Sequence, residues 1–128
     1  MAGVIVTHAG LAEALRAAAA AVAGDAAGLA TLSNEGLSQE DLGQRVRALV
    51  AGLEAPACIV FVDSRGSSCA TGCLFALRDL ANVRVIAGVN LPMLVDFLLR
   101  RNDHDLDAMV ERLLQRGRSS VLLLKGSS

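Results

Sequence analysis

The architecture of the chain is set by residues 58–68, which read Cys58-Ile59-Val60-Phe61-Val62-Asp63 and then Ser64-Arg65-Gly66-Ser67-Ser68. A second short apolar run, Val4-Ile5-Val6-Thr7, is followed in the same manner by a polar residue, His8. Runs of this length and composition predict strands. If both strands lie in one parallel sheet, then His8, Asp63 and the small-residue loop meet at one edge, because parallel strands end on the same side.

Strand and helix patterns alternate along the rest of the chain. The predicted strands cover residues 4–7, 28–32, 58–63, 83–87 and 121–124, and apolar residues at helical spacing predict helices over 11–23, 39–53, 70–77, 91–99 and 106–116. This alternation predicts an α/β fold, an open, doubly wound and mostly parallel sheet with helices on both faces. We expect about five strands, the first four in the flavodoxin-like order 2-1-3-4. The last, Val121–Leu124, follows two consecutive helices, so we expect it to run antiparallel at an edge.

Helix ends and buried faces also follow from the pattern. The predicted N-caps are Ser38, Asn90 and one of Asp103 and Asp105, and the predicted C-terminal stops are Gly24 and Gly117. The third helix should bury Ala70, Cys73, Leu74 and Leu77, and the fourth should bury Leu94, Val95, Leu98 and Leu99.

Composition excludes several classes of protein. With 128 residues and 53% hydrophobic residues, the chain has the size of one domain with a substantial core. A net charge of −1, no Trp or Tyr and three Phe offer neither a basic field nor a stacking surface for nucleic acid. No segment approaches the ~18 continuous apolar residues of a membrane helix, and the first apolar run is too short for a signal peptide. We therefore expect a cytoplasmic protein.

Neither a disulfide framework nor a metal site is expected from the cysteines and the second histidine. Three cysteines cannot all pair within one chain, and Cys58 falls in an apolar strand. Cys69 and Cys73 share a helix face, but a structural zinc site normally needs four ligands. His104 lies in a polar turn, where we expect it to be solvated.

His8 and Asp63 each have an ordinary explanation when taken alone. A lone histidine in a loop is most often solvated, and an aspartate after a strand is most often a helix cap. Their combination at the ends of two central strands favours chemistry, because one imidazole nitrogen attacks while a carboxylate fixes the tautomer and stabilises the cationic ring. The pattern predicts a phosphohistidine site with His8 and Asp63 as its catalytic pair.

Three segments of the chain resemble the IIA domain of the mannose-type bacterial sugar phosphotransferase system. They are Ile5–Gly10, the strand end Phe61–Asp63 with its loop Gly66–Ser68, and above all Ile86-Ala87-Gly88-Val89-Asn90-Leu91-Pro92-Met93-Leu94. The resemblance covers nearly the full chain and implies a single IIA domain over residues 1–128. It implies that His8 takes a phosphoryl group from the phosphocarrier protein HPr and passes it to a IIB component, and through it to the membrane components IIC and IID.

The resemblance also implies roles for individual residues. Nε2 of His8 would carry the phosphoryl group while Asp63 holds Nδ1, and the backbone amides of Gly66–Ser68 would bind the phosphate oxygens. Neither a metal ion nor another cofactor would be required. Members of the family commonly form dimers by exchanging the C-terminal strand, which suits Val121–Leu124.

The loop after Asp63 departs from the family pattern of two residues, then Gly-Gly, then Ser or Thr, then Pro. Here Ser67 replaces the second glycine and Cys69 replaces the proline. Ser67 either adds a hydroxyl to the phosphate site or impairs phosphate binding through its Cβ. Arg65 is hypothesised to help hold the phosphate, the alternative being a solvated side chain or a partner contact.

Three other functions remain open at this point. The phosphotransferase subunit of dihydroxyacetone kinase looks similar in fold and also has a strand-end histidine with an Asp and a Gly-Ser loop. A binding module that regulates another protein when His8 is phosphorylated is a second alternative. A flavodoxin-like domain that binds a small ligand is the third, although few aromatic residues exist to sandwich a flat ring.

Overall fold

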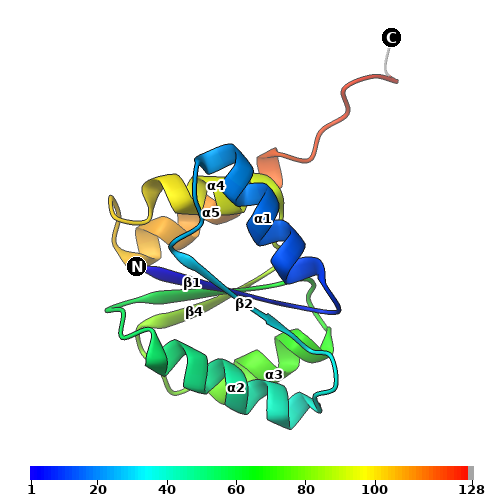
Figure 1. Ribbon diagram of the computed structural model, residues 1–128. Helices are drawn as coiled ribbons and strands as arrows, with labels where there is room; N and C mark the ends of the chain where they lie inside the picture. Colours follow the sequence, from blue (N-terminus) through cyan, green and yellow to red (C-terminus); the bar gives the residue numbers. More distant parts are fainter. Residues whose placement is uncertain (127–128) are drawn as a thin grey trace.

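The computed structural model describes residues 1–126 and has helices on both faces of one parallel sheet (Figure 1). The strands are β1 (Ala2–Thr7), β2 (Leu29–Ser33), β3 (Cys58–Val62) and β4 (Val83–Ala87), in the order β2-β1-β3-β4. The helices are α1 (Leu11–Ala23), α2 (Gln39–Gly52), α3 (Ser68–Leu77), α4 (Leu91–Arg100) and α5 (Leu106–Ser119). The predicted α/β class and strand order 2-1-3-4 are confirmed.

Each face of the sheet has its own apolar core, because successive side chains of a strand point to opposite faces. Helices α1, α4 and α5 cover the face that carries Ile59 and Phe61, where the Phe61 ring meets Phe97 edge-on at 5.4 Å between centroids. Helices α2 and α3 cover the face that carries Val60 and Val62. All five residues of β3 are buried, as the unbroken apolar run predicts for a central strand.

Most predicted helix ends are confirmed. Ser38, Asn90 and Asp105 each accept a hydrogen bond from an amide in the first turn of the helix that follows. Gly24 ends α1 with a φ of 104°. Gly117 does not end α5, which continues to Ser119. A Cβ at this glycine would lie 2.5 Å from Cε of Met93, so the glycine permits a close approach to α4 and does not stop the helix.

Two predicted core positions are wrong. Leu74 of α3 is 59% exposed and Leu99 of α4 is 58% exposed. Helix α4 packs on the sheet through Met93, Leu94 and Phe97, and Leu99 is turned away from that stripe. An apolar side chain at the edge of a helical stripe does not have to be buried.

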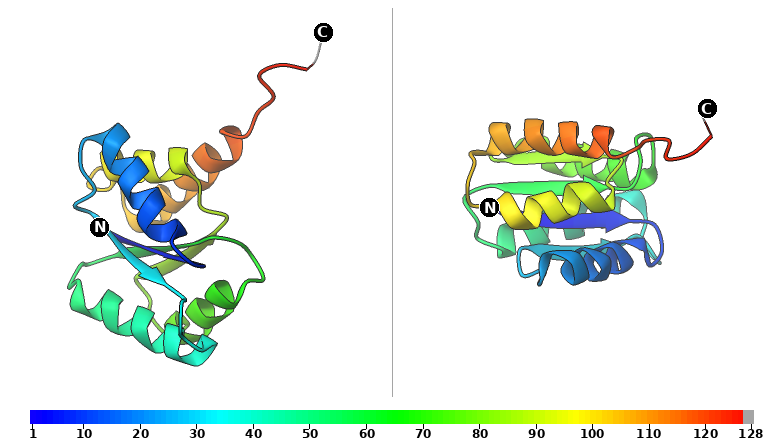
Figure 2. Two further views of the ribbon diagram at one scale, coloured as in Figure 1. Left: turned by 45° about the vertical axis from the view of Figure 1, so that its right-hand side comes forward. Right: turned by 90° about the horizontal axis from the view of Figure 1, so that it is seen from above.

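The predicted fifth strand is also absent from the sheet, which has four strands among residues 1–126. Val121–Leu124 extends away from the body of the molecule, with its four side chains 63–91% exposed (Figure 2). A strand needs a neighbouring backbone to satisfy its N–H and C=O groups. Val121–Leu124 runs away from the sheet, and within residues 1–126 it is not part of any strand pair.

Across the described part of the chain, no helix has the length and apolar character needed to cross a membrane.

Candidate functional site

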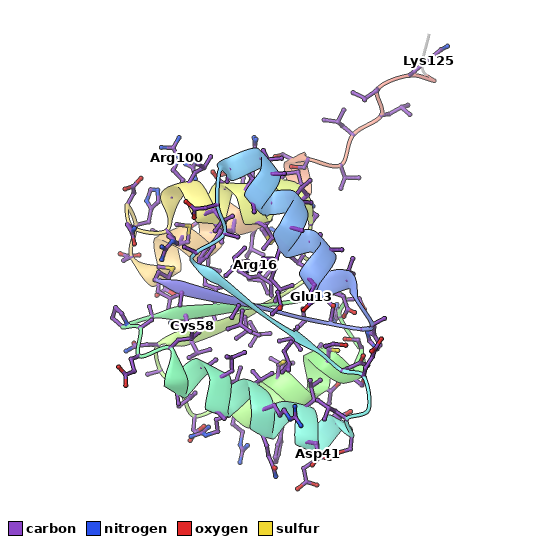
Figure 3. All side chains as sticks on the ribbon, viewed as in Figure 1. Glu13, Arg16, Asp41, Cys58, Arg100 and Lys125 are labelled. Atoms are coloured by element: carbon purple, nitrogen blue, oxygen red, sulfur yellow. The ribbon has the colours of Figure 1, made fainter. Side chains whose placement is uncertain are left out.

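His8 and Asp63 emerge side by side because β1 and β3 are neighbours in register. Val6 lies opposite Val62, so the two chains leave the sheet together at its carboxyl edge. This is the edge at which ligands bind in open parallel sheets, at the point where the strand order reverses. Cys58, at the first position of β3, lies at the opposite end of that strand (Figure 3).

The turn after β1 fixes the direction of the histidine. Ala9 has a φ of 49°, a left-handed conformation that non-glycine residues seldom adopt, and its amide donates a hydrogen bond to Oδ1 of Asn34. The buried hydroxyl of Thr7 accepts a hydrogen bond from the amide of Ala12 at 2.7 Å. The turn is therefore held from β2 on one side and from α1 on the other. Asn34, which follows β2, is a supporting residue that the sequence reasoning missed.

The His8 ring is oriented by the Asp63 carboxylate. Nδ1 lies 2.6 Å from Oδ2, and the same oxygen accepts the backbone amide of His8 at 2.9 Å. An ionised carboxylate only accepts hydrogen bonds, so in the neutral ring the proton is on Nδ1 and the lone pair is on Nε2. The His8 side chain is 49% exposed, whereas that of Asp63 is 13% exposed.

The hydrogen bonds on Asp63 keep it ionised. Burial by itself would raise the pKa of this carboxyl group, but hydrogen bonds from the ring and the amide of His8, together with one from the Ser64 amide, outweigh burial and hold the pKa below its usual range. Asp63 thus supplies a fixed negative charge beside Nδ1 at neutral pH.

The loop that follows Asp63 leads directly into α3. Gly66 has a φ of 78°, which explains a glycine there, whereas Ser67 has an ordinary φ of −74°. The Ser67 hydroxyl donates to the carbonyl of Ser64 at 2.9 Å and accepts from the amide of Ala70 at 3.0 Å. The hydroxyl proton is used in the bond to Ser64, and the hydroxyl oxygen caps α3 through the bond from Ala70. The Cβ of Ser67 does not strain the loop.

The first turn of α3 offers free donors. Ser68 is exposed, and the amides at the first two positions of a helix have no partner within it. Cys69 occupies the second of these positions and retains an N–H group, which a proline would lack. Arg65 is exposed on the loop and forms no ion pair with an acidic residue within residues 1–126.

Cys69 is the residue at this site that the sequence reasoning did not assign. Its buried Sγ lies 3.9 Å from Nδ1 of His8. Burial and the nearby Asp63 carboxylate raise the pKa of this thiol to about 11, so it is protonated at neutral pH. The available signal was its position six residues after Asp63, at the start of the helix.

The segment Ala87–Leu94 supports the site from the neighbouring strand. The amides of Gly88 and Val89 both donate to the carbonyl of Val62, the residue before Asp63. Asn90 caps α4 and its side-chain amide donates to the carbonyl of Gly117 in α5. The segment therefore positions the end of β3. His104, by contrast, lines a hollow with Met1 and Pro56 at the amino ends of the strands, away from the site.

Comparison with known proteins assigns the family. The family described as "PTS system fructose IIA component" (EIIA-man) matches residues 2–114. The chain belongs to this family. The "PTS system mannose-specific EIIAB component" of Escherichia coli (strain K12) is 35% identical over 92 residues, 70% of this chain and 28% of that protein. The IIA chain thus spans a little over a quarter of the length of the curated relatives that it matches.

Solved structures agree on the fold. Phosphotransferase system component EIIA from Streptococcus agalactiae superposes with a TM-score of 0.86 at 18% identity, covering 94% of this chain and 95% of that one. A mannose/sorbose-specific IIA subunit from Enterococcus faecalis gives 0.82 at 20% identity, with coverages of 99% and 96%. The matched residues 2–114 include His8, Asp63 and the loop, while Val121–Leu124 lies beyond them.

Proposed function

We propose that this IIA chain is a phosphohistidine carrier in which Nε2 of His8 accepts a phosphoryl group from phosphorylated HPr and passes it to a IIB component. The observation that carries the proposal is the 2.6 Å contact between Nδ1 and Asp63, which leaves the lone pair of Nε2 free on a half-exposed ring. In the reaction, the P–N bond of the donor breaks as the bond to Nε2 forms, and the donor imidazole leaves.

Asp63 is proposed to lower the barrier through its charge. The His8 ring becomes positively charged as Nε2 bonds to phosphorus, and the carboxylate on Nδ1 offsets that charge. The amides of Gly66–Ser68 and of Cys69 are proposed to bind phosphate oxygens at the start of α3, with Arg65 supplying a positive charge from the exposed loop. The Ser67 hydroxyl is left out of this set because it caps the helix.

Intact-mass measurement with phosphorylated HPr tests the carrier reaction. We expect the chain to gain one acid-labile phosphoryl group, His8→Ala to gain none, and the control His104→Ala to behave as the unsubstituted protein. Absence of a mass gain with the HPr of the same organism would refute the proposal. Adding the IIB component then separates transport from regulation, because a carrier is discharged and a purely regulatory domain is not.

The C-terminal segment is proposed to form a dimer contact. Val121–Leu124 exposes four consecutive apolar side chains, and β4 is an edge strand with one unpaired side. Pairing of this segment with the sheet of a second copy would bury the apolar side chains and satisfy both backbones. Light scattering should give the mass of a dimer for the full chain and that of a monomer for Leu122→Asp/Leu124→Asp. A monomeric full chain would contradict this part of the proposal.

Residues 1–128 are proposed to act as one domain. The two apolar cores lie on opposite faces of a single sheet, so neither half of the chain has a core of its own. A single cooperative unfolding transition, with the same midpoint by circular dichroism and by cysteine accessibility, is the expected result. Two separate transitions would argue for independent units.

A further inference from the structure

Cys69 adds to the proposed phosphorylation site a sulfur atom that could bind a metal and that phosphoryl transfer does not use. His8, Asp63 and Cys69 each offer one possible metal-ligand atom, and each of these atoms lies within 4.8 Å of the other two. The three residues come from separate segments: the end of β1, the end of β3 and the first turn of α3. We propose that these three side chains bind one divalent transition-metal cation, with Zn²⁺ as the best fit, and that the bound cation prevents phosphorylation of His8.

The spacing is close to that of a zinc site. With ordinary bond lengths of about 2.0–2.3 Å, neighbouring donor atoms around a tetrahedral Zn²⁺ lie about 3.3–3.6 Å apart. The distance from Nδ1 to Sγ is 3.9 Å, and that from Nδ1 to Oδ2 is 2.6 Å. To bind zinc, the Nδ1–Sγ distance must shorten slightly and the Nδ1–Oδ2 distance must lengthen by about 0.8 Å. A rotation of the exposed His8 ring changes both of these distances, the Asp63 and Cys69 ligand atoms already lie within 4.8 Å of each other, and water would fill the fourth position.

The donor set selects the kind of cation. An imidazole nitrogen, a thiolate and one carboxylate oxygen suit Zn²⁺ and related transition metals, whereas Mg²⁺ prefers a shell of oxygens. With Asp63 and the thiolate of Cys69 both negative, the loaded site would be neutral. Cys73 is not needed as a ligand: it lies one turn further along α3 and is outside the three-atom cluster.

Competition with phosphorylation follows from the protons of the ring. In the metal-free site the contact with Asp63 requires a proton on Nδ1, so the lone pair of the neutral ring is on Nε2. Binding of the metal to Nδ1 moves that proton to Nε2 through solvent, and the Cys69 thiol releases its proton to solvent. Nε2–H has no lone pair with which to attack phosphorus. Conversely, a phosphoryl group on Nε2 blocks the nitrogen to which the Nδ1 proton would move, so a metal could bind only if that proton were lost from the ring altogether, and each modification disfavours the other.

The competition rests on the proposed function, whereas metal binding does not, so the first test omits any phosphoryl donor. Untagged chain is titrated with Co²⁺ under reducing conditions, and the near-ultraviolet band from thiolate-to-cobalt charge transfer is followed. Zn²⁺ is then added to displace Co²⁺. We expect binding of one Co²⁺ per chain with that band, loss of the band when Zn²⁺ is added, and no displacement by Mg²⁺.

Variants decide which residues bind. Cys69→Ala should abolish the band and weaken Zn²⁺ binding at least about tenfold, and the matched control Cys73→Ala, also a buried cysteine of α3, should retain both. His8→Gln alters a half-exposed side chain that is not part of either core, and it should weaken binding to a similar extent. No charge-transfer band in the unsubstituted chain, or equal affinity in Cys69→Ala, would overturn the metal site.

The second test measures the competition. With HPr as donor, a Zn²⁺ concentration that saturates the unsubstituted chain but not Cys69→Ala should slow phosphorylation of the unsubstituted chain and of Cys73→Ala, and should leave the rate for Cys69→Ala nearly unchanged. Equal inhibition of all three would place the effect of Zn²⁺ on the donor and overturn the competition. A chain that binds Co²⁺ but is never phosphorylated would instead contradict only the carrier function.

Discussion

Replacing Asp63 by asparagine tests the electrostatic part of the mechanism with almost no change in shape. Oδ2 accepts two hydrogen bonds from His8, and Oδ1 accepts the amide of Ser64 at 2.9 Å. A carboxamide has only one accepting oxygen, so its NH₂ group must face a donor. Because two donors of His8 outweigh one of Ser64, the oxygen should turn towards His8, and the tautomer with a free Nε2 should persist.

The expected loss therefore comes mainly from the missing negative charge. A hydrogen bond to a charged group contributes about 1.5–3 kcal/mol, against about 1 kcal/mol for a neutral one. If this interaction stabilises the cationic ring only in the transition state, its full loss slows phosphorylation about 10- to 150-fold. The retained neutral hydrogen bond places Asp63→Asn towards the lower end of that range. Asp63→Ala, which also leaves the His8 amide without this partner, should fall towards the upper end.

The assay is a time course of phosphoryl incorporation by intact mass at fixed donor concentration. Asp79→Asn is the matched control, because it also removes a carboxylate from an ion pair, with Arg47, but at the far end of α3. It should be phosphorylated at the rate of the unsubstituted chain. Nitrogen-15 NMR of the His8 ring reports the tautomer independently. Phosphorylation of Asp63→Asn within twofold of the unsubstituted rate, with the tautomer unchanged, would refute the role given to the charge.

Four further outcomes concern stability. Because the pKa of Asp63 is depressed in the folded state, its carboxylate stabilises the fold at pH values above the ordinary Asp pKa of about 3.9. This contribution is lost as the pH falls through the folded pKa. Asp63→Asn should therefore flatten the acid limb of a stability–pH curve measured with urea. Burial raises the pKa values of the three cysteine thiols to about 11 or about 12, so the protonated thiols favour the folded state below about pH 8.5. Above about pH 8.5, the free energy of unfolding should fall by up to about 1.4 kcal/mol per pH unit for each thiol. This fall should be less steep in cysteine-to-alanine variants. Gly72→Ala would place a Cβ 2.9 Å from a backbone oxygen of α2 and should cost about 1–3 kcal/mol, whereas Gly52→Ala, with open space around it, should stabilise by about 0.4–1 kcal/mol. Asn90→Ala removes the cap of α4 and the tie to α5, and its unfolding free energy should fall by about 1–2 kcal/mol; an unchanged value would contradict the positioning role of that segment.

The sequence predicted the sheet well because its strands are short, apolar and bounded by turn residues. The meeting of His8 and Asp63 was also predictable, since parallel neighbours must end at the same edge. Leu74 and Leu99 were misplaced because periodicity gives the direction of a helical stripe but not its width. The exposed tail was misassigned because apolar residues indicate a need for burial without saying which chain provides it.

The loop after Asp63 was the least predictable part, because its residues act through contacts that no local pattern shows. The pattern leaves open whether Ser67 adds a hydroxyl to the phosphate site or obstructs it; the structure shows that this hydroxyl caps α3 and that an ordinary φ removes the expected strain. Cys69 looked like a packed thiol, and it lies against the histidine ring.

Position 69 connects the two proposals made for this site. Compared with proline, cysteine adds a backbone N–H that points from the start of α3 and a thiol that lies 3.9 Å from Nδ1. The first addition favours the proposed phosphate on Nε2, and the second favours the proposed metal on Nδ1, so one residue would support two competing states of His8. Alanine at this position keeps the N–H and removes the thiol, whereas proline removes both. The two effects are therefore chemically separable at a single residue, and the balance between them depends on the local concentrations of phosphoryl donor and transition metal.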